Sequence, residues 1–169
     1  MQSEHRYLVK FLVTSAVAFF IGTLHGLLQV LPPIRAWLDS IGSPYGGPGH
    51  MIDPLAHAHI NLIGGVTLLA MAVTYYLLPV IGGVPIHSRR MAQHSFWWTT
   101  IGVGSFYILL LIFGAWEGIL WAHNPAEVPE IHRFYGPLIS IASTVLALGF
   151  WIYLANVLLT VRDIRRSES

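Results

Sequence analysis

Histidine is the residue type with most chemistry to offer in this chain, which has nine histidines and no cysteine among 169 residues. The lack of cysteine excludes disulfides, thiolate zinc sites, iron–sulfur clusters and covalent c-type haem attachment. Two histidines, His57 and His59, are separated by one alanine. On a helix, residues i and i+2 point about 200° apart, so the two imidazoles face opposite sides. The pair therefore indicates two cofactors, or one cofactor at each of two helix interfaces, rather than one shared ion.

Imidazole is a good axial ligand for haem iron, and small residues let a flat macrocycle approach a helix closely. Gly64 and Gly65 follow the histidine pair on the same expected helix, and two Gly-x-x-x-Gly motifs occur at 22–26 and 114–118, on the first and third expected helices. The alternative is that these glycines serve helix–helix packing. The alternative for His57 and His59 is that they only form hydrogen bonds between helices.

The remaining histidines divide into two groups. His5, His87 and His94 flank the apolar segments, where solvated surface residues are expected. The other group is predicted to lie at one depth near the opposite end of the bundle, with one acidic residue, Glu117, beside it. Its members are His25, His50, His57, His59, His123 and His132. Such a polar cluster is costly in an apolar bundle and indicates a cofactor or a water-filled cavity.

The elements that must position these residues are visible in the distribution of charge. Charged residues make up only 10% of the chain and hydrophobic residues 54%, whereas soluble domains carry about 25% charged residues. This excludes a disordered chain and argues against a soluble bundle, which needs polar outer faces. Four stretches contain no charged residue: 11–34, 54–88, 91–116 and 134–161. Each is longer than the roughly 20 residues that span a bilayer.

The sequence therefore predicts an all-α protein, a single four-helix transmembrane domain over 1–169. The helices are expected at about 11–31, 55–81, 96–121 and 134–161. The first helix is expected to be an anchor, since no small-residue cleavage site follows it. The connection at 32–54, rich in proline and glycine, is expected to be an irregular outer loop. A net charge of +1 with no basic face gives no reason to expect nucleic acid as a partner.

Lysine and arginine predict the orientation of the helices. Seven of the nine basic residues flank the helices on the side of the two termini and of the 82–95 loop. The positive-inside rule places that side in the cytoplasm. Only Arg35 and Arg133 fall on the other side. The expected location is the cell (inner) membrane, with both termini cytoplasmic.

At this point the sequence resembles a known family, the catalytic subunits of haem–copper oxidases, and most closely those of cbb3-type cytochrome oxidases and nitric oxide reductases. The segment 57–65 (HAHINLIGG) is similar to the histidine helix in the last block of these subunits. Further segments resemble the family in the same order: 75–79 (YYLLP), 94–102, 117–121 (EGILW) and 154–162 (LANVLLTVR), and more loosely 22–26 (GTLHG). The resemblance covers nearly the whole chain but only the last third of a family subunit.

The resemblance implies roles for individual residues. In the family, the first histidine of the pair is the proximal ligand of the high-spin haem, and the second is an axial ligand of the low-spin haem. His57 and His59 take these positions, so both are expected to be haem iron ligands, with non-covalent haem b as the cofactor. His25 falls where an acidic residue of the cbb3 type is expected. The other low-spin ligand and the three copper ligands of the family come from earlier helices.

The family subunit is arranged as three similar four-helix blocks around an axis, which predicts how a single block can complete its sites. A homo-oligomer, with a trimer favoured, would bring His57 and His59 of neighbouring copies together. His25 and His132 are the next ligand candidates, and His132 with Arg133 is suited to haem propionates. An interfacial charge is the alternative for Arg133.

Three functions are compatible with these predictions. The first is a membrane b-type cytochrome that transfers electrons in a respiratory-type chain, with quinol or a cytochrome c as redox partner. The second is a gas-reactive haem protein that reduces or senses O2 or NO at an open iron position. A copper or non-haem iron site built from His25, Glu117, His123 and His132 would suit that chemistry, although no spacing among them is diagnostic. The third is a haem-free scaffold that keeps the fold.

Overall fold

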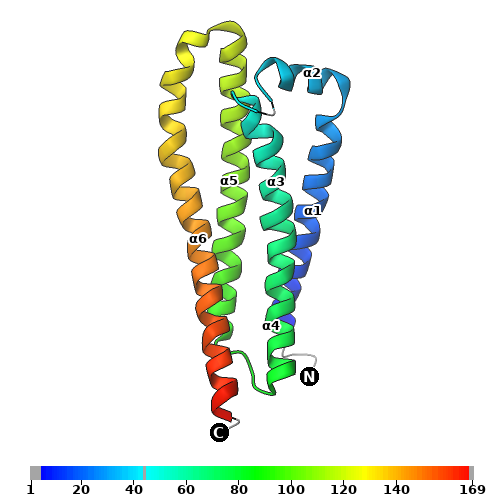
Figure 1. Cartoon of the computed structure of the whole chain (residues 1–169), viewed down its shortest axis with the longest axis vertical. Coiled ribbons are helices and arrows are strands. Elements are labelled where there is room, and N and C mark those ends of the chain that lie inside the picture. The colour runs from blue at the N-terminus through cyan, green and yellow to red at the C-terminus, as the bar shows by residue number, and fades with distance from the viewer. Residues whose placement is uncertain (1–4, 44, 168–169) are drawn as a thin grey trace.

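The computed structural model describes residues 5–43 and 45–167, and four long helical segments run side by side in it (Figure 1). No strand occurs in this part of the chain, so the prediction of an all-α four-helix fold is confirmed. The segments are α1, the run from η2 to α4, α5 and α6. Their bounds are η1 Arg6–Leu8, α1 Val9–Gln29, η2 Met51–Ala56, α3 His57–His59, η3 Ile60–Thr67, α4 Leu68–Gly82, α5 Arg89–His123, η4 Pro125–Glu127 and α6 Val128–Ser167.

All four segments are long and apolar enough to cross a bilayer: Arg6–Gln29, Met51–Gly82, Arg89–His123 and Pro125–Ser167. Large apolar side chains remain exposed along them, including Phe20 at 67% and Trp151 at 62%. In water such a surface would be costly, whereas lipid tails accept it. The chain is therefore a multi-pass membrane protein.

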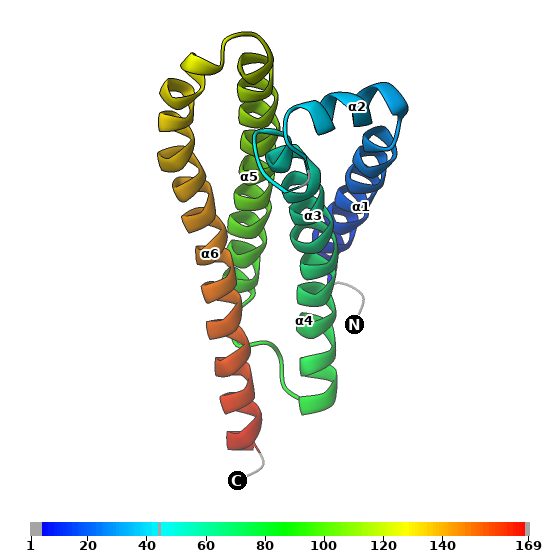
Figure 2. The same cartoon turned by 45° about the horizontal axis from the view of Figure 1, so that its top comes forward.

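The four segments pack as two pairs, joined along the centre of the bundle (Figures 1 and 2). In one pair α5 and α6 form a long hairpin, with Gly102 against the backbone of Leu146 and Gly149 against the backbone of Thr99. Small residues at such contacts let two backbones approach closely, which is how helices associate in lipid. In the other pair α1 lies along η3 and α4.

Asn156 and its neighbours fix the end of the bundle where α1 begins and α6 ends (Figure 1). The fully buried Asn156 amide accepts a hydrogen bond from Ser88 N and donates one to Ser88 O, both at 3.0 Å. Thr160 Oγ1 accepts from His87 N at 3.0 Å. His87 Nδ1 lies 2.7 Å from Asp163 Oδ2. These contacts hold the α4–α5 connection against α6.

The connection at 32–54 is not an irregular loop throughout, because it contains α2 (Pro32–Ser40). Its two prolines occupy the first turn of the helix, where a missing N–H costs nothing. Arg35 bonds Asp39 one turn later and Asp53 across the loop, both at 2.6 Å, and these bonds raise the pKa of Arg35. Leu38 is fully buried. The prolines therefore begin a capping helix that covers this end of the bundle.

The two helices of the α5–α6 hairpin are longer than the sequence predicts. α5 begins at Arg89 instead of 96, with the Ser88 side chain accepting from Met91 N. α6 extends from Val128 to Ser167 instead of 134–161. Charged side chains are tolerated in helix turns outside the hydrocarbon, so charge-free stretches mark the part inside the membrane and not the helix ends.

Candidate functional site at the histidine-rich end

The opposite orientation of His57 and His59, predicted from their spacing, is confirmed by their neighbours. The His57 ring faces α1, where its centroid lies 5.6 Å from that of His25. The His59 ring faces α5 and stacks on Phe106, with centroids 4.5 Å apart and planes 29° apart. Both side chains are half-buried. One helix thus presents an imidazole to each of two interfaces.

One ring nitrogen of His59 forms a hydrogen bond, and the other keeps its lone pair. Its Nδ1 lies 2.8 Å from the carbonyl oxygen of Leu55, one turn earlier. A carbonyl can only accept, so Nδ1 carries the proton and Nε2 keeps its lone pair. Histidines that ligate metals generally donate their other N–H in this way, which fixes the tautomer and the ring orientation. The donor chemistry of His59 therefore suits an iron ligand.

His57 is held through its backbone and its surroundings rather than through its ring nitrogens. Among the described residues, neither ring nitrogen has a hydrogen-bond partner. Asn61 donates to the His57 carbonyl at 3.0 Å, and the Asn61 amide occupies the space above Gly22. The His57 ring lies directly over Gly26, where a Cβ would approach it to 3.0 Å. The first Gly-x-x-x-Gly motif thus makes room for this turn of helix.

His25, a predicted ligand candidate, is engaged at both nitrogens. Gln29 donates to His25 Nε2 at 2.9 Å and also to the carbonyl of Ile52 at 3.2 Å. His25 Nδ1 therefore carries the proton and lies 3.2 Å from the hydroxyl of Tyr107. The ring is 8% exposed. In this arrangement His25 forms a buried network beside His57, and no lone pair of its own remains for a metal.

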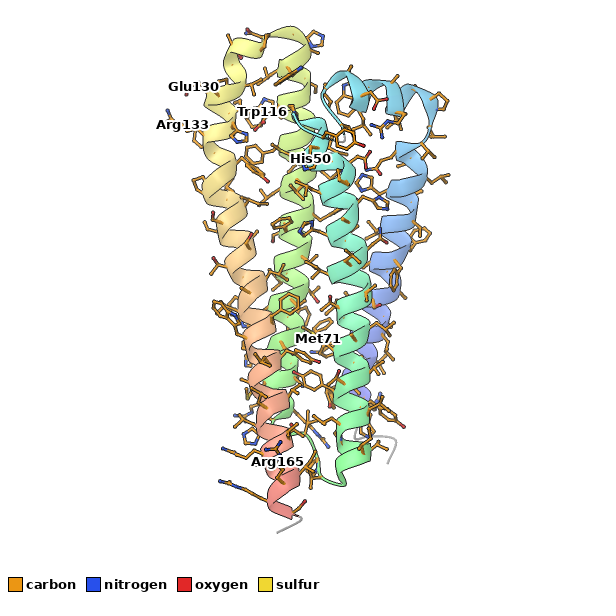
Figure 3. The ribbon with its side chains drawn as sticks, in the orientation of Figure 1. His50, Met71, Trp116, Glu130, Arg133 and Arg165 are labelled. Atoms are coloured by element: carbon orange, nitrogen blue, oxygen red, sulfur yellow. The ribbon has the colours of Figure 1, made fainter. Side chains whose placement is uncertain are left out.

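His132 is brought against Glu117 by the α5–α6 hairpin. Its Nδ1 donates to both carboxylate oxygens of Glu117, at 3.0 and 3.1 Å. The Glu117 side chain is 3% exposed and that of His132 is 52% exposed. Arg133 points away with Glu130, to which it donates at 3.4 Å (Figure 3). The structure thus joins Glu117 and His132 but leaves Arg133 on the surface.

The remaining histidines at this end do not join these groups. His123 is exposed, and its Nδ1 bonds the carbonyl of Ile119 at 2.9 Å. His50 lies at the start of the second long segment (Figure 3). Within residues 5–43 and 45–167, no three His, Asp or Glu side chains come together as a metal site. The grouping of His25, Glu117, His123 and His132 around one ion is therefore not assembled within one chain.

The volume of the cavity beside His59 indicates whether one chain can enclose a macrocycle. A cavity of about 90 Å3 lies beside His59, lined by Ala58, His59, Leu62 and Ile63. Pockets that enclose a ligand of drug size are roughly 300–1,000 Å3. The glycines leave no extra room, because Ala18 and Phe19 fill the space above Gly64 and Gly65. Their role is helix packing, so the donor atoms suit haem iron while one chain supplies only part of the enclosing wall.

Sequence reasoning missed three residues of this site: Gln29, Phe106 and Tyr107. Gln29 stands one turn after His25, so an i, i+4 pair of polar residues in an apolar helix was a usable signal. Phe106 and Tyr107 lie in the middle of a charge-free stretch, and nothing local distinguishes them from lipid-facing aromatics.

Comparison with known proteins points to membrane oxidases. No family model matches the chain. It is 24% identical over 116 residues to the cbb3-type cytochrome c oxidase subunit CcoN1 of Stutzerimonas stutzeri, covering 68% of this chain and 22% of that protein. It is 25% identical over 123 residues to cytochrome c oxidase subunit 1 of Rhodobacter capsulatus, covering 63% and 23%. The chain spans less than a quarter of these relatives, and the partial similarities support a relationship to haem–copper oxidases.

Proposed function

We propose that this chain is a membrane b-type cytochrome that binds haem b through His57 and His59 and transfers electrons in a respiratory-type chain. The observation that carries the proposal is the arrangement of the two imidazoles on α3, which face two different interfaces. Haem b, when bound, supplies one-electron chemistry at its iron. The similarity to oxidase subunits supports the same cofactor class.

The chain's own residues prepare each side for this role. On the α5 side, Leu55 fixes the His59 tautomer and Phe106 holds the ring plane. On the α1 side, Gly26 makes room for the His57 ring and Asn61 secures its backbone. Histidines held in this way would need little rearrangement to bind haem iron, which would favour electron transfer over ligand exchange.

The second wall of each site comes from another copy of the chain. The cavity at His59 is too small to enclose a macrocycle, and apolar residues beside it are exposed, with Leu62 at 59% and Val66 at 48%. A homo-oligomer in which His57 and His59 of neighbouring copies face each other supplies the missing wall and the second ligand. Closed rings are usual for such contacts, and a trimer matches the three-block arrangement of the subunits that the sequence resembles.

Absorption spectra of the purified protein test this function against the gas-reactive alternative. Sharp reduced α and β bands that carbon monoxide leaves unchanged are expected for six-coordinate haem b. A Soret band shifted by carbon monoxide would assign the chain to O2 or NO chemistry at an open iron position. Spectra that stay unchanged in both His57→Ala and His59→Ala would leave only the scaffold function.

A further inference from the structure

We propose that Glu117 and His132 form a proton-exchange site at the histidine-rich end, in which His132 carries protons between the surroundings and the buried carboxylate. Neither residue is one of the proposed haem ligands, His57 and His59. Glu117 lies on α5 and His132 on α6, and the hairpin brings His132 Nδ1 to 3.0 Å from Glu117 Oε1.

The carboxylate of Glu117 is buried, with its side chain 3% exposed. Glu117 stands in α5, whose segment Arg89–His123 is long and apolar enough to cross a bilayer. An ionisable side chain at such a position is costly and usually functional. Among the described residues, His132 is the only hydrogen-bond partner of the carboxylate.

The imidazole is the route by which a proton reaches this carboxylate. When Glu117 is ionised and His132 is neutral, His132 carries its single ring proton on Nδ1, and Nε2 keeps a lone pair on a side chain that is 52% exposed. A proton taken up from water at Nε2 is balanced by transfer of the Nδ1 proton to Glu117. The result is a neutral carboxyl group and an imidazole protonated at Nε2, so the pair has gained one proton and one unit of charge.

The described groups around the pair come from α6 and from the segment around α2. Tyr135 contacts the His132 ring, with centroids 5.3 Å apart and planes tilted by 36°. Glu130 and Arg133 on the same helix are paired with each other, and their side chains are 73% and 69% exposed. Trp37 of α2 and Ile41, which follows α2, approach Gly118 and bring no charge. Among the described residues named here, Tyr135 is therefore the titratable neighbour that faces the pair, and the Glu130–Arg133 ion pair lies at the surface.

An apolar cluster connects this pair to His59. Phe106, which stacks on His59, and Tyr135, which contacts His132, both pack on the same buried core around Leu110 and Phe113. Charges interact strongly across such a medium of low dielectric constant. An electron added at the His59 side therefore favours proton uptake by the pair. This coupling rests on the proposed haem function, whereas the proton exchange does not.

Infrared spectroscopy of the purified protein tests the exchange itself. We expect one component of the protonated-carboxyl absorption to disappear in Glu117→Gln and to remain in Glu130→Gln, the exposed control. In His132→Gln, Glu117 should re-equilibrate after a pH jump roughly 100-fold more slowly, because the proton carrier is gone. His123→Gln is the matched histidine control. A Glu117 band that does not titrate, or equal rates in His132→Gln and the wild type, would overturn the proposal.

Redox titration tests the coupling. The midpoint potential of the haem protein should fall as pH rises, and Glu117→Gln should remove this dependence without lowering the haem content. Glu130→Gln should keep it. A pH dependence that persists in Glu117→Gln overturns the coupling. Purified protein without haem overturns the proposed function instead, and the infrared experiment then decides the exchange alone.

Discussion

The Nδ1 of His59 lies 2.8 Å from the carbonyl oxygen of Leu55, and this contact leaves the Nε2 lone pair of His59 uncommitted. This hydrogen bond fixes the tautomer of His59, and stacking on Phe106 fixes the plane of its ring. Together they define the direction in which Nε2 points. His57, two residues earlier, faces α1 instead. One turn of helix thus serves two interfaces, and mutations on the two sides are expected to act separately.

Replacing His59 should remove haem, whereas replacing His123, a histidine with an equivalent hydrogen bond, should not. His123 forms the same bond to a carbonyl one turn earlier, at 2.9 Å, but is exposed at the end of α5. We expect His59→Ala to lose its six-coordinate absorption bands and His123→Ala to keep them at the wild-type haem-to-protein ratio. Equal spectra of the two variants would show that a hydrogen bond from Nδ1 to a helix carbonyl does not distinguish a haem ligand from other histidines.

His25 should matter for stability more than for ligation, because both of its nitrogens are engaged. His25→Phe keeps a ring beside His57 but removes one partner of the buried Gln29 amide and the partner of the partly buried Tyr107 hydroxyl. The expected cost is about 1–3 kcal/mol in the free energy of unfolding, with haem retained. Thermal unfolding in detergent and the haem-to-protein ratio measure the two effects. Loss of haem in a variant that stays folded would make His25 a ligand.

Gly22 should accept a side chain only at a cost in stability. A Cβ there meets the amide of Asn61, which bonds the backbone of His57. Gly22→Ala should lower the free energy of unfolding by about 1–3 kcal/mol, as overpacking generally does. It should also broaden the absorption bands of the haem at His57. Gly104→Ala is the control, since nothing lies within 4 Å of the Cβ position there. Equal stability of both variants would contradict the packing of α1 on this turn.

Asn156 should keep the α4–α5 connection closed. Its amide is the partner of both the N–H and the C=O of Ser88. Asn156→Ala leaves the partly buried N–H and C=O of Ser88 without this partner, at a cost of about 1–3 kcal/mol, and should speed protease cleavage between α4 and α5. Asn124→Ala, at an exposed position in the α5–α6 connection, should leave the cleavage rate between α4 and α5 unchanged. An unchanged cleavage rate would mean that the connection is held by its remaining contacts.

The features that sequence predicted well are those with a local cause. Four charge-free stretches predict four helices, because length and polarity alone decide what a bilayer accepts. The opposite directions of His57 and His59 follow from the geometry of one helix turn. The Pro-Pro start of α2 was misinterpreted as a loop signal, since proline is as typical of a first helical turn as of a loop.

The features that sequence could not predict depend on which helices meet. Tyr107 is 82 residues from His25, and only the fold brings the two together. Glu117 and His132 were expected at one depth, yet their pairing needs the hairpin register of α5 and α6. The glycines near the histidines are compatible with a macrocycle or with helix packing until the neighbouring side chains, such as Phe19 above Gly65, are known.

The most direct test of the central claim, that His57 and His59 hold haem b, is the absorption spectrum of the purified protein, oxidised and dithionite-reduced, beside that of His59→Ala. We expect sharp reduced α and β bands in the wild type and their loss in the variant at unchanged expression and folding. A wild-type protein that purifies as a folded bundle without any Soret band would contradict the account.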